Sequence, residues 1–159
     1  MMPLDARERF ENTRRAIARL DEVHALIMYD CDDWKPEGVK AHGETSDPTA
    51  QRAIFAVDEL GVKLEALRAE ERELERLIGE SGTIIQAVRA GFSEQFGDWL
   101  EWRYIDLWTW EQFADELSTD EKPVTRKQAR EKVRYWCGVT FDWIDSVGIS
   151  RLLRGEVDV

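Results

Sequence analysis

A run of basic residues in the last third of the chain is the part of this sequence best suited to chemistry with another molecule. Between positions 125 and 136, five Lys and Arg residues stand against one acidic residue, Glu131. The five are Arg126, Lys127, Arg130, Lys132 and Arg134. On a helix that enters the major groove, N-terminal side chains read base edges while flanking Lys and Arg neutralise phosphates. The run therefore indicates a local DNA-binding surface.

The charge of the whole chain sets the opposite expectation. Its 159 residues carry 33 Asp and Glu against 22 Lys and Arg, which gives a formal net charge of -11. Such a chain does not attract a phosphate backbone as a whole, so any contact with DNA has to be local. The competing interpretation is an amphipathic surface helix whose positive charges pair with the acidic body of the protein. Composition alone favours neither.

A helix, a turn and a second helix are predicted to position the basic run. After Trp110, the apolar residues Phe113, Ala114 and Leu117 fall at helical spacing. Thr109 precedes them as an N-cap, and Gln112 stands three residues later as the partner of a capping box. The polar stretch 118–123 ends this helix.

The second helix is predicted to begin near Thr125. Ala129, Val133 and Trp136 occupy one face of it, and the arginines at 126, 130 and 134 occupy another. Five of the seven Trp residues lie between positions 99 and 136, and aromatic side chains dominate core energetics. The same stretch is therefore expected to hold the core, with Phe141 and Ile144 returning to it.

Residues 103–117, Arg-Tyr-Ile-Asp-Leu-Trp-Thr-Trp-Glu-Gln-Phe-Ala-Asp-Glu-Leu, resemble the helix-turn-helix of sigma-factor region 4. More narrowly, the chain is similar to the ArpU/RinA-like regulators of Gram-positive phages. In those, two long helices joined by a loop that ends in a Ser-Asp step precede the helix-turn-helix, and Ser46 and Asp47 stand at that place. The resemblance implies DNA binding by Thr125, Arg126, Lys127, Arg130 and Arg134. It also implies a motif core of Tyr104, Trp110, Phe113, Ala114, Leu117 and Val133.

Two long helices are predicted in the first half of the chain. Apolar residues from Leu4 to Met28 recur at steps of three and four, and the seam reads Phe10, Thr13, Ile17, Leu20, His24 and Ile27. The second helix starts at Pro48, where a proline suits the first turn. Its seam reads Ala53, Val57, Leu60, Leu64, Leu67, Glu71, Leu74 and Ile78. The two helices can pair antiparallel within one chain or between chains.

The predicted fold is therefore all-α, with two parts. Residues 1–79 form an antiparallel helical hairpin (a coiled coil) with a loop at 30–48, and residues 80–159 form a helix-turn-helix domain. The string 79–83, Gly-Glu-Ser-Gly-Thr, is expected to end the second long helix, and 151–159 to form a frayed tail. A heptad seam on each arm favours a homodimer.

Neither His residue stands in an enzyme motif, and no nucleotide-binding glycine pattern is present, so we expect a protein that is not an enzyme. No cofactor is expected, and a metal site is not expected because His24 has no second ligand nearby in the sequence. The spacing of Asp30, Asp32 and Asp33 fails the calcium-loop pattern. Neither a signal peptide nor a membrane span is predicted, which favours the cytoplasm of a bacterial host.

The function predicted from the sequence is a phage or prophage-encoded transcriptional regulator that binds double-stranded DNA and contacts RNA polymerase or another protein. A DNA-packaging recognition subunit would use the same parts. From a different class, an acidic protein inhibitor of a nucleic-acid-handling enzyme would fit the net charge. Its partner-binding residues would be Trp34, Asp30, Asp32 and Asp33, because an exposed Trp in an acidic loop can anchor a protein partner.

Overall fold

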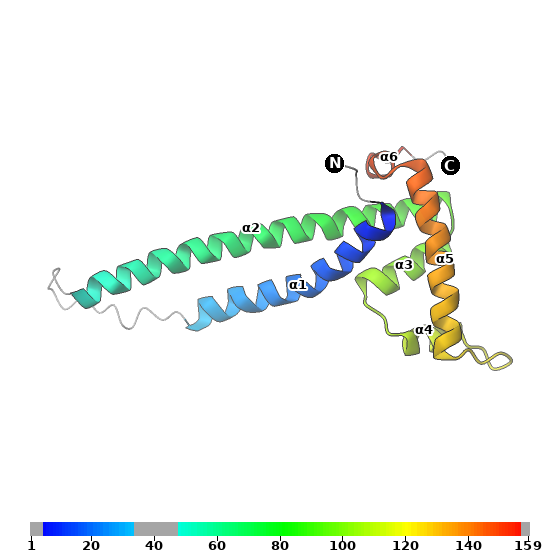
Figure 1. The fold of residues 1–159 in the computed structure, drawn as a ribbon, viewed down its shortest axis with the longest axis horizontal. Coiled ribbons are helices and arrows are strands. Elements are labelled where there is room, and N and C mark those ends of the chain that lie inside the picture. Colours follow the sequence, from blue (N-terminus) through cyan, green and yellow to red (C-terminus); the bar gives the residue numbers. More distant parts are fainter. Residues whose placement is uncertain (1–4, 34–47, 157–159) are drawn as a thin grey trace. The chain divides into compact units, whose positions relative to one another are not determined.

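The computed structural model of this chain describes residues 5–33 and 48–156, with side chains for 5–29 and 59–156. The α-helices labelled in Figure 1 are α1 (Ala6–Asp33), α2 (Pro48–Gly91), α3 (Glu94–Leu100), α4 (Trp110–Leu117), α5 (Arg126–Val147) and α6 (Ile149–Leu153). A π-helical segment, Glu101–Ile105, continues α3. The described residues contain no strand, which confirms the all-α prediction. None of their helices offers an apolar stretch that could cross a membrane.

The chain divides into two compact units. One, here called the core unit, consists of Met1–Ile17 and Arg76–Val159. The other, here called the arm unit, is Ala18–Glu75. The start of α1 and the end of α2 therefore belong to the core unit, together with all of α3 to α6.

Aromatic side chains fasten the start of α1 into the core unit. The Phe10 ring lies 5.6 Å from that of Tyr104 and 5.5 Å from that of Phe141, measured between centroids. The backbone N–H of Ala6 donates to Asp145 Oδ1 over 2.9 Å, which ties the first turn of α1 to α5. The remaining members of this core come mainly from α2 to α5 and include Ile84, Ile85, Val88, Trp99, Leu100, Phe113, Val133 and Ile144.

Helix α2 runs without a break through residues 79–83, so the expected end of the helix there is wrong. Each glycine in a helix costs only about 1 kcal/mol, which burial of the neighbouring residues can offset. Ser81 is buried and its hydroxyl lies 2.6 Å from the Thr13 hydroxyl of α1, while Ile84 and Ile85 enter the core. The sequence showed the two glycines, which disfavour a helix, but not the packing that offsets their cost.

Two capping boxes define the starts of α4 and α5, and the first of them, at Thr109, was predicted from the sequence. Thr109 Oγ1 accepts from the Gln112 N–H, and the Gln112 side chain accepts from the Thr109 N–H. Thr125 and Gln128 repeat the arrangement at α5. In the turn between the helices, the Ser118 hydroxyl accepts from the Val124 N–H at 2.7 Å. This bond closes the turn and fixes where α5 begins.

Residues 137–153 are more helical than the sequence predicted. Helix α5 continues past Trp136 to Val147, with Phe141 and Ile144 buried as predicted. Gly148 then adopts a φ of 99°, which favours glycine, and α6 follows. Leu152 of α6 is buried, so the prediction of a frayed tail from 151 is wrong as far as Leu153. Leu152, with the partly buried Ile149 and Leu153, packs this last helix against the core.

In the arm unit, the α1 and α2 segments run side by side in opposite directions (Figure 1). Arg19 Nε donates to Glu70 Oε1 over 2.6 Å between the two helices. Val23 is buried, whereas His24 is 46% exposed at its side chain, so the predicted α1 seam is one residue out at this point. Helix α1 also extends to Asp33, so the predicted loop at 30–48 begins too early.

Candidate nucleic-acid interface

A concavity of about 660 Å³ opens in the core unit where α4 and α5 begin. We call it the basic groove, because five basic side chains line it against one acidic side chain, Glu111. The five are Arg14, Arg103, Arg126, Lys127 and Arg130. Thr109, Leu107, Trp108 and Trp110 complete the lining. A concave surface of one charge focuses its field on a ligand of the opposite charge, which here is an anion.

Helix α5 presents its first turn to the basic groove. Arg126, Lys127 and Arg130 are exposed there, and the N–H groups of the first two have no acceptor among the described residues. Unpaired N–H groups at a helix N-terminus carry partial positive charge and favour anions. Arg126 also pairs with Glu111 over 3.1 Å, but both side chains are about 70% exposed. Such a pair contributes little to stability and an anion can displace it.

Two of the five basic residues, Arg14 and Arg103, were not predicted from the sequence. Arg14 comes from α1 and Arg103 from the π-helical segment, and only the fold brings them beside α5. A weak signal did exist for α1. Arg7, Glu11 and Arg14 follow one another at steps of four and three, so they share a helix face next to the buried one. The sequence alone does not show that α1 packs near α5, so this face could not be assigned to a binding surface.

Trp110 holds two guanidinium groups at the edge of the groove. The Arg103 guanidinium carbon lies 4.3 Å from the centroid of the Trp110 ring, and that of Arg134 lies 5.9 Å from it. Both distances are within the range of a cation–π interaction, which is worth about 0.5–1 kcal/mol at exposed sites. Arg134 itself lines a smaller neighbouring concavity of about 210 Å³ with Arg7 and Glu11. The predicted basic helix therefore contributes to a wider positive surface.

Two of the positive charges in the basic groove, Arg14 and Arg103, lack close acidic partners among the described residues. Burial lowers the pKa of Arg103, and the nearby positive charges of Arg14 and Arg134 lower it further, while Glu11 opposes them. Among the described residues, neither Arg14 nor Arg103 has a carboxylate oxygen within 4.0 Å. Like charges gathered without counter-charges repel one another, which an anionic ligand would relieve.

Arg89 shows the contrasting arrangement elsewhere in the core unit. Its guanidinium bonds Asp98 over 2.9 Å and Glu101 over 2.5 Å. Burial alone would lower the pKa of Arg89, but the hydrogen bonds that it donates to both carboxylates raise that pKa above its usual value. Arg9 likewise pairs with Glu80. The chain thus pairs Arg9 and Arg89 with carboxylates, whereas Arg14 and Arg103 of the groove have no such pair among the described residues.

Backbone strain lies next to the groove. Leu107 adopts a φ of 55°, in the left-handed region that non-glycine residues rarely enter. The rings of Trp102 and Trp108, which precede and follow Leu107 in the sequence, stack on each other with centroids 4.4 Å apart and an interplanar angle of 8°. The Trp108 N–H also donates to the Trp102 carbonyl over 2.7 Å. These contacts hold the tight turn that leads the chain into α4.

The remaining residues predicted for this site fall into two groups. Thr125 is exposed and caps α5. Of the predicted motif core, Tyr104, Phe113, Ala114 and Val133 are buried, whereas Trp110 and Leu117 are half-buried and pack against the core. Burial raises the pKa of the Tyr104 hydroxyl well above 10. The predicted partner residue Trp34 lies outside the described residues, as do the side chains of Asp30, Asp32 and Asp33.

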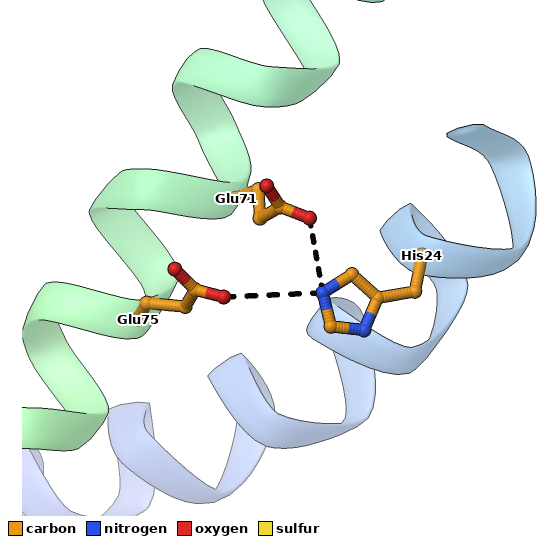
Figure 2. A group of neighbouring side chains, drawn as sticks. All are labelled: His24, Glu71 and Glu75. Atoms are coloured by element: carbon orange, nitrogen blue, oxygen red, sulfur yellow. Dashed lines mark ion pairs between the residues drawn. The ribbon is translucent and has the colours of Figure 1, made fainter. Parts of the chain in front are cut away.

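In the arm unit, His24 of α1 lies close to two carboxylates of α2. Both are far from it in the sequence, so this grouping was not predicted. Its Nε2 lies 3.0 Å from Glu71 Oε2 and 4.0 Å from Glu75 Oε1 (Figure 2). The three side chains offer ligand-type atoms within 4.8 Å of one another. All three are partly or largely exposed, and an ion pair between the two helices accounts for the grouping without a metal.

Comparison with protein-family models, with curated proteins and with solved structures gives no match for this chain. The interpretation of the basic groove therefore depends on its own geometry and charge.

Proposed function

We propose that this chain is a DNA-binding transcriptional regulator of the kind that phages and prophages encode, and not an enzyme. In this proposal α4, the turn 118–125 and α5 act as a helix-turn-helix, with the first turn of α5 in the major groove of double-stranded DNA. The observation that carries the proposal is the basic groove: five basic side chains gather at the starts of α4 and α5 in a chain of net charge -11.

Roles for the basic side chains follow from their positions on α5. Arg126, Lys127 and Arg130 occupy the first turns of the helix, where side chains of a helix-turn-helix reach base edges. Arg134 lies one turn further on and would contact the phosphate backbone. Phosphate contacts fix the orientation of the protein, and base contacts give it sequence preference.

The arm unit would supply protein contacts. Its two antiparallel helices could pair with a second copy of the chain or touch RNA polymerase. A symmetric dimer would place two α5 helices on half-sites about one helical turn of DNA apart. A DNA-packaging recognition subunit would use the same arrangement, and binding to a phage packaging site instead of a promoter distinguishes it.

The charge of the arm unit favours one alternative from another class. Residues 18–75 contain fifteen Asp and Glu against seven Lys and Arg. A strongly acidic surface imitates a phosphate array, so the chain could inhibit a nucleic-acid-handling enzyme by occupying its basic groove. In that case the acidic arm would bind a protein, and the basic groove of the core unit would have no nucleic-acid partner.

DNA binding measured against salt separates the two functions. A labelled duplex should bind the wild-type protein with an affinity that falls steeply as KCl rises, because binding releases counterions from the phosphates. Replacing Lys127 by Ala should weaken binding. Replacing Lys132 by Ala is the matched control, since Lys132 has the same charge on the same helix and does not line the groove. Absence of duplex binding even at low salt would reject the regulator and favour the inhibitor.

A further inference from the structure

We infer that Arg14 and Arg103 together hold one backbone phosphate of duplex DNA in the basic groove, so that α1 takes part in the DNA contact. This inference rests on the proposed function and adds to it. A helix-turn-helix contact would need only α4 and α5. Here a residue of α1 and one of the π-helical segment line the same concavity as the first turn of α5.

Charge supplies the first argument for a bound phosphate. Arg14 and Arg103 have no carboxylate oxygen within 4.0 Å among the described residues, and the positive charge of Arg14 disfavours that of Arg103. Two such cations can be brought together stably by an anion that both contact. A phosphate diester is suited to this, because guanidinium groups bond its oxygens in pairs of parallel hydrogen bonds.

Preorganisation supplies the second argument. The Arg103 guanidinium lies 4.3 Å from the centroid of the Trp110 ring, which restrains its plane before a ligand arrives. The N-terminus of α5 opens into the same groove, where the backbone N–H groups of Arg126 and Lys127 have no acceptor in the part of the chain that the structure describes. A phosphate there would meet two guanidinium groups and the positive end of a helix of 22 residues.

The aromatic rings of the groove argue for duplex DNA over a single strand. Proteins that bind single strands stack bases on exposed aromatic faces. Here Trp108 stacks on Trp102, and Trp110 carries the Arg103 guanidinium. Both rings are thus engaged inside the protein. The lining that remains for a ligand is mainly cationic, which suits a phosphate backbone.

Salt-dependent binding of a labelled, mixed-sequence DNA duplex tests the inference. Arg14→Gln should weaken binding and lower the slope of log affinity against log salt measurably. The fall should be less than the roughly 0.9 expected for one whole phosphate contact on B-DNA, because Arg103 still faces the same phosphate. Arg15→Gln is the matched control, because Arg15 is the next residue on α1, is exposed and does not line the groove. Arg103→Lys should also weaken binding, since a lysine keeps the charge and loses the paired hydrogen bonds.

The outcomes separate this inference from the proposed function. If Arg14→Gln and Arg15→Gln bind with the same slope while Lys127→Ala binds more weakly, α5 contacts DNA and the phosphate clamp is wrong. If the wild-type protein binds no duplex, both the proposed function and the clamp are wrong. Thermal melting of each variant ensures that weaker binding is not loss of fold.

A measurement on the wild-type protein gives a second readout that no variant can confound. The NMR signal of the Arg103 Nε–H group should shift when the duplex is added and should shift less with single-stranded DNA of the same sequence. A shift with inorganic phosphate alone, and none with duplex, would assign the groove to a small anion and overturn the DNA clamp. An unchanged signal with every probe would reject an anion site at Arg103.

Discussion

The core unit and the arm unit of this chain differ in both charge and packing. The core unit, residues 1–17 and 76–159, contains eighteen acidic and fifteen basic residues, whereas the arm unit contains fifteen acidic and seven basic. The net charge is therefore -8 for the arm unit (7 - 15) and -3 for the core unit (15 - 18), although the arm is the shorter unit. A net charge of -11 describes neither surface well, and it does not argue against an anion site in the core unit.

Packing differs in the same direction. The core unit buries a continuous aromatic and aliphatic cluster that includes Phe10, Phe113 and Ile144. In the arm unit, Val23 and Leu67 are the buried residues among those with described side chains. Regions with few buried apolar side chains open at lower free energy cost than a packed core. We expect the arm helices to exchange their amide protons faster than α5.

Phe113→Ala should have the largest effect on stability. The ring is fully buried and contacts the rings of Trp102, Trp108 and Trp110. Removing a buried phenylalanine typically costs about 3–5 kcal/mol, which is a large part of the stability of a small domain. Thermal unfolding followed by Trp fluorescence should show a large fall in Tm. A Tm close to that of the wild type would mean that this core is not formed around Phe113.

Leu67→Ala should lower the free energy of unfolding by less, about 2 kcal/mol. Fewer buried side chains surround Leu67 in the arm, so its truncation leaves a smaller cavity. Its effect should also be local. Hydrogen exchange measured by mass spectrometry should accelerate in residues 59–75 and stay unchanged in α5. Equal acceleration in both regions would show that the two units unfold together and that the arm unit does not open at a lower free energy than the core unit.

The capping boxes should each contribute about 1 kcal/mol. Thr109→Ala removes the acceptor for the Gln112 N–H at α4, and Thr125→Ala removes that for the Gln128 N–H at α5. Both residues are exposed, so neither change opens a cavity. Chemical denaturation should give similar losses for the two variants, and Thr→Ser at each position should restore most of the loss because the hydroxyl returns.

Arg19→Gln should have the smallest effect and should appear mainly as a change in acid sensitivity. The hydrogen bond from Arg19 lowers the pKa of Glu70 from its usual 4.5. The stability contributed by this pair is therefore present above pH 4.5 and is lost as pH falls through the lowered pKa. Circular dichroism between neutral and acidic pH should show less pH-dependent loss of helix in the variant. High salt should reduce the difference, because both side chains are partly exposed.

Local features of this fold were predictable from the sequence, and those that depend on distant packing were not. The capping box at Thr109 was predicted because a hydroxyl and a glutamine three residues apart are enough to form it. The box at Thr125 and Gln128 has the same spacing, but only the start of the helix near Thr125 was predicted. The continuation of α2 through Ser81 was missed because it depends on the Thr13 hydroxyl, 68 residues away.

The candidate site follows the same rule. Arg126, Lys127 and Arg130 were predicted from their density on one helix. Arg14 and Arg103 were missed because their proximity to α5 depends on Phe10 packing between Tyr104 and Phe141. The choice of His24 for the α1 seam was wrong because three-four spacing leaves two registers open, and the smaller Val23 fits the interior.

The rate of alkylation of Cys137 can report how often the core unit opens. Its thiol is 4% exposed on the inner side of α5, and burial raises its pKa to about 12. Because only a thiolate alkylates quickly, this cysteine should resist iodoacetamide at neutral pH for as long as the core stays closed. The rate at which the Cys137 peptide is alkylated, followed by mass spectrometry so that Cys31 is not counted, then measures how often α5 opens away from its neighbours.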